Sequence, residues 1–422
     1  PSSKLAMQGA DIIFNLSASN ELVGKNAYRK SLVLQQSGRC NAAYVYASAG
    51  CGESSTDLVF SGATTIAENA RLLAEGKRFS LDNEMIVSDI DITALRSDRL
   101  KNSNFIPPRE KSVPEIACAL EAVCVERLDR EFNPHPFIPS PEKEDEHLSE
   151  VFNIQTAGLA KRLLHTGVRT ITIGVSGGLD STLALLVAVK TFDLLNLPRQ
   201  NIIGITMPGF GTTGRTYNNA LELMKSAGVT VKEIPIVNAV TQHLKDIGHD
   251  INLHDVTYEN AQARERTQIL MDYANKTGGL VVGTGNLSEL ALGWATYNGD
   301  HMSMYGVNTS VPKTLVASLT RWIADTQMEE RPRKILQDIL DTPFSPELLP
   351  ADKEGKIAQK TEHFIGPYEL HDFFLHRMLR YGDPPKRICF IAQHAFVNRY
   401  PPEEILKWLK VFYKRFFAQQ FK

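Results

Sequence analysis

Hydrophobic and polar positions from residue 147 onward predict strands that alternate with helices. The β-branched stretch 170–175 has the composition of a buried strand, and apolar positions recur at helical spacing after Asp180. Further strands are predicted at 201–207, 229–234 and 279–283, with helices between them. Because strands and helices alternate, we expect a doubly wound parallel sheet that binds its ligands at the carboxyl edge.

The first 131 residues follow another pattern, in which helices and strands lead into a run of strands. Helices are predicted at 3–9 and 27–37, and strands at 11–17, 43–48, 57–66, 70–79 and 85–92. The chain opens on a helix with no strand before it, so we interpret this part as an incomplete α/β sheet.

Residues 132–146, FNPHPFIPSPEKEDE, are predicted to form a linker. Four prolines precede a cluster of charges, and such a stretch runs extended on a surface because it cannot bury a core. We therefore expect two domains, 1–131 and 147–422, joined by this segment. The second domain ends in an amphipathic helix that Pro401 and Pro402 open.

The composition argues against several classes of protein. With 422 residues, 43% of them hydrophobic and 22% charged, the chain is an ordinary globular sequence. A net charge of -2 argues against a nucleic-acid partner, and no apolar run reaches the length of a membrane span. The five cysteines contain no CxxC pair, which disfavours a disulfide framework or a zinc site and indicates a cytoplasmic protein.

A glycine turn follows the strand at 170–175. Ser176, Gly177 and Gly178 lead into a helix N-terminus, an arrangement that binds anions. The turn lacks the Gly-Lys-Ser/Thr ending of a Walker A loop and the glycine spacing of a Rossmann turn. Asp180 places a carboxylate where a phosphate would lie, so a divalent cation must bridge them, which indicates a Mg²⁺–pyrophosphate site. In the alternative interpretation, Ser176 and Asp180 only cap the helix.

A second carboxylate, Glu289, follows the strand at 279–283. Glu289 lies three residues after Asn286, a spacing typical of a capping box, and such pairs are usually structural. In the functional interpretation, Glu289 joins Asp180 in holding the cation, because the carboxyl ends of parallel strands meet at one edge of the sheet.

Three strings of residues in the second domain resemble known families. SGGLDS at 176–181 resembles the pyrophosphate loop of the ATP pyrophosphatases, which cleave ATP to AMP and pyrophosphate. GTGNLSELALGWATYNGDHMSMYGVNTSVPKTLVASLTRW at 283–322 and YENAQARER at 258–266 resemble the glutamine-dependent NAD⁺ synthetases, and the likeness covers nearly all of 147–422. It implies an adenine nucleotide α-hydrolase-like fold, a homo-oligomer, and ATP-dependent amidation of deamido-NAD⁺ through an acyl-adenylate, with Mg²⁺ and ammonia.

The resemblance also assigns roles to residues at matching positions. Asp180 and Glu289 would hold Mg²⁺, Lys313 would neutralise the departing pyrophosphate, and Asp300 would take a proton from the incoming ammonium. The residues that would bind ATP are Gly174, Val175, Ser176, Gly177, Gly178, Leu179, Asp180, Ser181, Arg264 and Thr284. The residues that would contact deamido-NAD⁺ are Asn260, Glu289, Trp294, Tyr297 and Lys422.

Several of these residues also have a plainer interpretation. Taken alone, Lys313 would be a solvated surface lysine and Asp300 a turn residue beside a glycine. Trp294 and Tyr297 would be ordinary core aromatics, whereas in the functional interpretation they offer a flat surface for the pyridine ring.

The helix predicted at 258–275 carries two arginines. Arg264 and Arg266 are spaced by two and point to different faces, so only Arg264 is expected to reach the nucleotide. Asn260 lies one helical turn before Arg264 and shares its face, whereas Arg266 is expected to make an ion pair or a subunit contact.

Residues 1–131 resemble the rear part of a nitrilase-type glutaminase domain, an α-β-β-α sandwich. The matching strings are GADIIFNLSAS, RCNAAYVYASAGCGESS and LVFSGATTIAENARLLAEG. That family hydrolyses glutamine with a Cys, a Glu and a Lys, which the resemblance places before Pro1, so no glutaminase residue is assigned and Cys40 and Cys51 are expected to pack. We therefore expect a longer complete protein, and a chain that by itself uses ammonium rather than glutamine.

Two other functions remain open at this point. Another ATP pyrophosphatase, such as GMP synthetase or a tRNA-modifying enzyme, would share the loop but adenylate a different acceptor. A tRNA substrate would call for a basic face and often for paired cysteines, which the sequence does not offer. A non-catalytic nucleotide-binding module would bind deamido-NAD⁺ without turnover.

Overall fold

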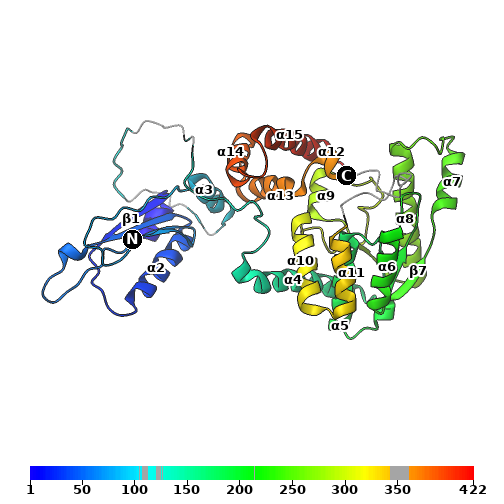
Figure 1. Ribbon diagram of the computed structural model, residues 1–422, viewed down its shortest axis with the longest axis horizontal. Helices are drawn as coiled ribbons and strands as arrows, with labels where there is room; N and C mark the ends of the chain where they lie inside the picture. The colour runs from blue at the N-terminus through cyan, green and yellow to red at the C-terminus, as the bar shows by residue number, and fades with distance from the viewer. Residues whose placement is uncertain (104, 107–112, 120–124, 126, 213, 343–360) are drawn as a thin grey trace. The chain divides into compact units, whose positions relative to one another are not determined.

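The computed structural model describes residues 1–103, 105–106, 113–119, 125, 127–212, 214–342 and 361–422. They form two compact units, Pro1–Phe132 with Arg377–Pro384, and Asn133–His376 with Pro385–Lys422 (Figure 1). Cys124 lies outside the described residues, and the free thiols among the described cysteines are Cys40, Cys51, Cys118 and Cys389. In the described part of the chain, no helix combines the length and the apolar character that crossing a membrane requires.

The first unit is built on a four-stranded mixed sheet in the order β1-β2-β3-β4. β1 and β2 are parallel, and the β2–β3 and β3–β4 pairs are antiparallel. Its elements are α1 (Ser2–Met7), β1 (Ile12–Ser17), α2 (Lys25–Cys40), β2 (Ala43–Ser48), η1 (Cys51–Glu53), β3 (Thr64–Glu68), β4 (Arg71–Glu75), α3 (Ile92–Lys101) and η4 (Arg377–Tyr381).

Two strand predictions in this unit are wrong in extent or in kind. Within the predicted strand 57–66, pairing begins only at Thr64. The predicted strand at 85–92 is not a strand, and α3 begins at Ile92, where the Asp91 side chain accepts from the Ala94 N–H at 2.9 Å. Met85 and Val87 are exposed, so the apolar alternation there does not mark a buried face.

A segment from far along the chain completes the first unit. The Arg377 guanidinium, almost fully buried, pairs with Asp383 at 2.5 Å and Asp91 at 3.4 Å. Arg380 pairs with Asp98 at 2.5 Å. Local sequence patterns do not reveal such a return of the chain, so this part of the first unit was not predicted.

The second unit is built on a parallel sheet of five strands in the order β7-β6-β5-β8-β9. Its elements begin with η2 (Pro141–Lys143), α4 (Glu144–Thr166), β5 (Ile171–Gly174), α5 (Leu179–Leu194), η3 (Arg199–Asn201), β6 (Ile202–Thr206), α6 (Gly214–Ser226), β7 (Thr230–Glu233), α7 (Val237–Asp246), α8 (Val256–Thr277) and β8 (Leu280–Gly283). They continue with α9 (Leu287–Leu292), β9 (Tyr305–Gly306), α10 (Lys313–Gln327), α11 (Glu330–Leu340), α12 (Thr361–Ile365), α13 (Tyr368–His376), α14 (Pro385–Ala395) and α15 (Pro402–Ala418). The doubly wound parallel sheet is thereby confirmed.

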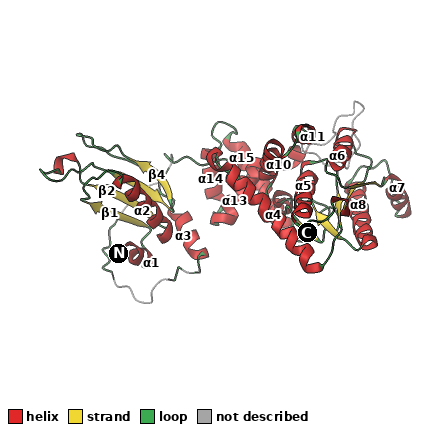
Figure 2. Cartoon of the chain, turned by 90° about the horizontal axis from the view of Figure 1, so that it is seen from below, coloured by secondary structure: helices red, strands yellow, loops and turns green. Residues whose placement is uncertain are grey.

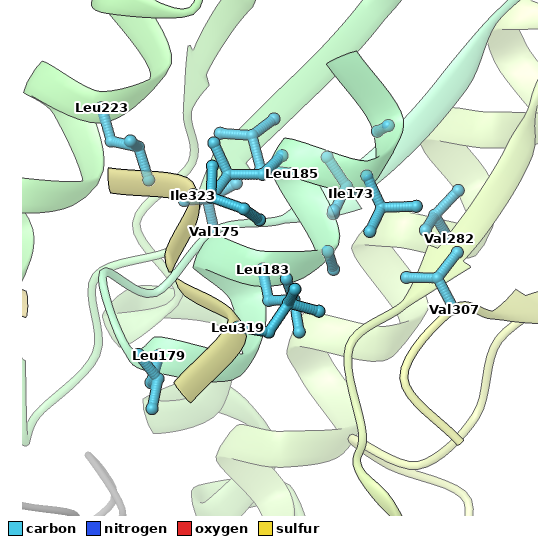
Figure 3. Close-up of a cluster of buried hydrophobic side chains, with 14 of the residues drawn as sticks. Ile173, Val175, Leu179, Leu183, Leu185, Leu223, Val282, Val307, Leu319 and Ile323 are labelled. Carbon is cyan, nitrogen blue, oxygen red and sulfur yellow. The ribbon is translucent and has the colours of Figure 1, made fainter. Parts of the chain in front are cut away.

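Helices cover both faces of this sheet (Figures 1 and 2). On one face, α4, α5, α6, α10 and α11 contribute to the main core, in which Ile173 and Val282 of neighbouring strands meet Leu183 of α5 and Leu319 of α10 (Figure 3). On the other face, Ile203 and Ile205 of β6 pack with residues of α7 and α8. Because successive strand residues point to opposite faces, β6 contributes to both cores, and its apolar run is the pattern of a strand buried on both sides.

The path of the chain creates a switch point at the middle of the sheet. From β5 the chain adds β6 and β7 on one side, then crosses to add β8 and β9 on the other. The loops after β5 and β8, which are adjacent parallel strands, therefore leave the carboxyl edge in different directions. Open α/β sheets bind their ligands at such a point.

Residues 132–146, which were expected to be a linker, belong partly to the first unit and mostly to the second. Phe132 belongs to the first unit and Asn133 onward to the second, where α4 already begins at Glu144. Phe137 packs against the main core of the second unit, so this proline-rich stretch contributes apolar contacts there. The domain limits 1–131 and 147–422 stay predictions.

Candidate active site at the carboxyl edge of the parallel sheet

The loop after β5 is a tight turn held by serine hydroxyls. The Ser176 Oγ accepts from the Gly178 N–H at 3.2 Å, and the Ser181 Oγ donates to the Gly178 carbonyl at 3.0 Å. Gly177 has φ +84°, and a Cβ there would lie 2.0 Å from the Thr216 carbonyl oxygen, so only glycine fits. The first N–H groups of α5 have no partner within a helix and carry partial positive charge, so the turn is suited to bind an anion.

Asn286 links the two strand-end loops at the switch point. Its Nδ2 donates to Asp180 Oδ1 at 2.9 Å, and its Oδ1 accepts from the Glu289 N–H at 3.0 Å. Asn286 is thus the N-cap of α9, as the spacing indicated, and its amide also holds Asp180. A second buried amide, Asn308, donates to the backbone carbonyls of Asp180 at 3.0 Å and Thr284 at 3.1 Å.

Lys313 brings the two predicted carboxylates together. Its Nζ donates to Asp180 Oδ2 and, at 3.2 Å, to Glu289 Oε1, and the side chain is almost completely buried. Since one nitrogen atom touches both carboxylates, they lie close enough to share one cation. The interpretation of Lys313 as a solvated surface lysine is therefore wrong.

Burial and charge act strongly on this cluster. Desolvation and the neighbouring Asp180 carboxylate raise the pKa of Glu289 to about 7, although Lys313 opposes the shift. Desolvation lowers the pKa of the Lys313 ammonium, but the two carboxylates outweigh it and raise the pKa overall. A further positive charge beside Glu289 would favour the ionised form of this carboxyl.

The donor set fits magnesium. Asp180 and Glu289 offer hard carboxylate oxygens beside the anion-binding turn. In the part of the chain that the structure describes, no group of three or more His, Cys, Asp or Glu residues is arranged for a metal. A metal here would therefore complete its shell with water and phosphate oxygens, as Mg²⁺ commonly does.

The loop 293–301 gathers several of the predicted substrate residues. Asp300 Oδ1 accepts from the Thr296 N–H at 2.7 Å, and Asn260 Oδ1 accepts from the Thr296 hydroxyl at 2.7 Å. Arg264 Nε donates to the Tyr297 carbonyl at 3.2 Å, so the loop is tied to α8. Asp300 is an exposed residue, yet desolvation by the atoms around its carboxyl raises the pKa of this group, against hydrogen bonds and the charges of its neighbours.

Arg264 and Arg266 point in different directions, as expected from their spacing. Arg264 contacts the loop just described, whereas Arg266 Nε donates to the Met207 carbonyl at 3.3 Å, at the end of β6. The assignment of Arg264 to the nucleotide stays a prediction.

The C-terminal segment closes on the same loop. Lys422 Nζ donates to the carbonyls of Gly293 at 2.9 Å and Ala295 at 2.6 Å. The Arg415 guanidinium lies 4.9 Å from the ring centre of Trp294, which is half-buried. Tyr297 is 45% exposed and therefore not a core aromatic. Roles in substrate binding for these residues remain predictions.

Sequence reasoning missed four polar residues beside the cluster. Asn308, Ser288 and Asp372 are buried polar side chains whose partners lie far away in the sequence, and Tyr368 places its ring 5.6 Å from Lys313 Nζ. The only signal was that Ser288 and Asn308 lie inside the string resembling NAD⁺ synthetases. Local spacing gave none for Tyr368 and Asp372 on α13.

The fold and the site together define a class of protein. A doubly wound parallel sheet with an anion-binding glycine turn and two carboxylates at its switch point is the architecture of an α/β protein that binds a ligand at that point. A family model described as NAD synthase matches residues 151–406, and the chain belongs to that family.

Individual relatives agree with this assignment. The chain is 44% identical to a glutamine-dependent NAD(+) synthetase of Mycobacterium leprae, covering 100% of this chain and 66% of the relative. It is 30% identical to one of Thermotoga maritima, over 92% of this chain and 64% of the relative. The chain thus spans slightly less than two thirds of the length of these relatives.

A solved structure supports the fold of both units. The crystal structure of a glutamine-dependent NAD(+) synthetase from Cytophaga hutchinsonii matches 99% of this chain and 65% of its own, with a TM-score of 0.52 and 18% sequence identity. The expected fold class, a parallel α/β sheet with a partial nitrilase-like sandwich, is confirmed.

Proposed function

We propose that this chain catalyses the ATP-dependent amidation of deamido-NAD⁺ to NAD⁺, with release of AMP and pyrophosphate. Membership of the NAD synthase family and the names of the relatives support the reaction. The observation that carries it is the cluster of Asp180, Glu289 and Lys313 beside the glycine turn.

The reaction must first activate a carboxylate, which is a poor electrophile because its charge is spread over both oxygens. In the proposed step, a carboxylate oxygen of deamido-NAD⁺ attacks the α-phosphorus of ATP and pyrophosphate leaves. Ammonia then attacks the carbonyl carbon of the resulting acyl-adenylate, which releases AMP and leaves an amide. The protein must therefore stabilise the departing pyrophosphate and supply an uncharged ammonia molecule.

The chain's own groups suit the first of these tasks. The turn at 176–178 and the N-terminus of α5 hold a phosphate group, and Lys313 supplies fixed positive charge next to it. Mg²⁺ held by Asp180 and Glu289 would add positive charge at the leaving pyrophosphate. Asn286 keeps the Asp180 carboxylate aimed at this point.

For the second task, Asp300 is the proposed acceptor of the proton that ammonium must lose. A carboxyl whose pKa is raised by desolvation binds a proton more readily than one in water. Trp294 and Tyr297 line the neighbouring loop and are the proposed surface for the pyridine ring.

The wider setting of the enzyme is also a proposal. The relatives are named glutamine-dependent, so we propose that glutamine supplies the ammonia in the complete protein. We further propose a cytoplasmic homo-oligomer with no nucleic-acid or membrane partner. The cysteine pattern, the net charge of -2 and the family resemblance support this setting.

The assay follows NAD⁺, AMP and pyrophosphate after the chain is mixed with ATP, Mg²⁺, deamido-NAD⁺ and ammonium. We expect the three products in equal amounts, and none of them when deamido-NAD⁺ is omitted. Formation of ADP and phosphate would contradict the assignment to the pyrophosphatase class. Amidation of xanthosine monophosphate in place of deamido-NAD⁺ would favour the GMP synthetase alternative.

A further inference from the structure

A buried carboxylate lies next to the cluster of Asp180, Glu289 and Lys313 and has no role in the steps described so far. Asp372 on α13 is 1% exposed. It accepts hydrogen bonds from the Ser288 hydroxyl, from the Thr314 N–H at 3.0 Å and from the Thr314 hydroxyl at 2.7 Å. Three donors from two other elements therefore converge on one side chain of α13.

The partners of Asp372 are the sequence neighbours of the cluster. Ser288 precedes Glu289 in α9, and Thr314 follows Lys313 at the start of α10. The Ser288 hydroxyl also accepts from the Lys313 N–H at 2.8 Å. A continuous set of hydrogen bonds thus joins the backbone that carries Lys313 to the residue next to Glu289.

An ionised carboxylate suits this position for a specific reason. It only accepts hydrogen bonds, so its two oxygens can serve all three donors at once. It also lies against the N-terminus of the 15-residue helix α10, where the helix dipole favours negative charge. One turn earlier on α13, the Tyr368 ring lies 5.6 Å from Lys313 Nζ, so the same helix contacts the ammonium of the lysine directly and its backbone through Ser288.

We propose that Asp372 is a positioning residue, which acts through Ser288 and Thr314 to hold Lys313 and Glu289 in the mutual geometry needed for release of pyrophosphate. The expected effect on the rate rests on the proposed function. The expected effect on the position of Lys313 rests on the hydrogen bonds alone. Asp372 itself does not contact the anion-binding turn through any of these bonds, so its effect must pass through Lys313 and Glu289.

The first test removes single hydrogen bonds and compares rates. Ser288→Ala and Thr314→Val should each lower kcat by about 10- to 100-fold, the size expected when a catalytic group is displaced by about 1 Å. Thr314→Ser, which keeps the hydroxyl, should restore activity to within about threefold of the wild type. Thr320→Val is the matched control, because Thr320 is a buried threonine of the same helix whose hydroxyl donates to the Val316 carbonyl within that helix, and it should leave kcat unchanged.

A double-mutant cycle separates positioning from general loss of stability. If Asp372 acts through Lys313, then Asp372→Asn should lower kcat/KM strongly in the wild type but only slightly in a Lys313→Met background. If the losses of kcat/KM from Asp372→Asn and Lys313→Met multiply in the double variant, the proposal is overturned. It is also overturned if Thr320→Val lowers kcat as much as Thr314→Val does. If Asp372→Asn does not fold, Ser288→Ala takes its place in the cycle.

A structural readout keeps this proposal separate from the proposed function. If the wild-type chain forms no AMP, the proposed function fails, and crystal structures of the wild type and of Ser288→Ala then decide. The proposal expects Lys313 Nζ to leave hydrogen-bonding distance of Glu289 in the variant. A lysine that stays in contact with both carboxylates would overturn it.

Discussion

At the scale of single residues, the site depends on one ammonium between two carboxylates. Lys313 contacts Asp180 across 133 positions of sequence and Glu289 across 24. The sequence predicted both carboxylates as partners of one cation and predicted Lys313 as a third charge nearby. That the lysine touches both could not be predicted, because the contact arises from the packing of α10 against the switch point.

Asp180→Asn is expected to abolish formation of AMP, with a loss of at least about 100-fold, the size seen when a preorganised charge is removed. The substitution removes one carboxylate from the cation site but keeps the shape of the side chain. The control is Asp193→Asn on the same helix, because Asp193 is an exposed partner of Arg199 and should leave the rate unchanged. AMP release at the wild-type rate from Asp180→Asn would remove Asp180 from the mechanism.

Gly177→Ala is expected to destabilise the second unit and to weaken ATP binding, because the new Cβ would lie 2.0 Å from the Thr216 carbonyl oxygen at a φ of +84°. Gly167→Ala is the matched comparison, since Gly167 has φ +71° but open space around it. The comparison should cost about 1–2 kcal/mol of unfolding free energy, from backbone strain alone. Urea unfolding measures the free energy of unfolding of the two variants. Equal losses of stability in Gly177→Ala and Gly167→Ala would show that the contact with Thr216 imposes no constraint.

At the scale of elements, the sequence predicted the strands whose apolar residues are buried in the structure. The strands at 170–175, 201–207 and 279–283 were confirmed because each contains a short apolar run covered by helices, whereas the strand at 229–234 was confirmed although β7 lies at the edge of the sheet and exposes Lys232 and Glu233. The two-residue strand β9 is too short to leave a pattern, and the apolar alternation near Met85 faces solvent. Asp372 on α13 was missed because its partners belong to α9 and α10.

His371, on the same helix, is expected to make the stability of the second unit depend on pH. Burial is the main cause that lowers its pKa from 6.5 to about 4, while Nε2 contacts the Ile365 carbonyl at 2.5 Å. Below pH 6.5 the unfolded chain binds a proton that the folded chain does not. Stability is therefore fully present above pH 6.5 and is lost as the pH falls toward 4, by up to about 3 kcal/mol.

The measurement is thermal unfolding of the wild type and of His371→Gln between pH 4 and pH 7.5. Glutamine can still donate to the Ile365 carbonyl but carries no titratable group. The wild type should therefore lose more stability than the variant over this range. Parallel curves would mean that His371 is protonated in the folded protein at the same pH as in the unfolded one.

At the scale of the whole molecule, the chain combines two units whose sheets differ in kind. The first unit has a mixed sheet and includes the segment Arg377–Pro384, and the second has a parallel sheet that carries the site. Every residue of the cluster around Lys313 belongs to the second unit. We therefore expect the chemistry of adenylation to be a property of this unit, with ammonia supplied from outside it.

The most direct test of the account follows oxygen-18 from the carboxylate of deamido-NAD⁺. Attack of that carboxylate on the α-phosphorus of ATP, followed by displacement with ammonia, leaves one carboxylate oxygen in the phosphate of AMP. Mass spectrometry of the products should thus find the label in AMP and none in pyrophosphate. Label in inorganic phosphate, together with ADP, would contradict the account.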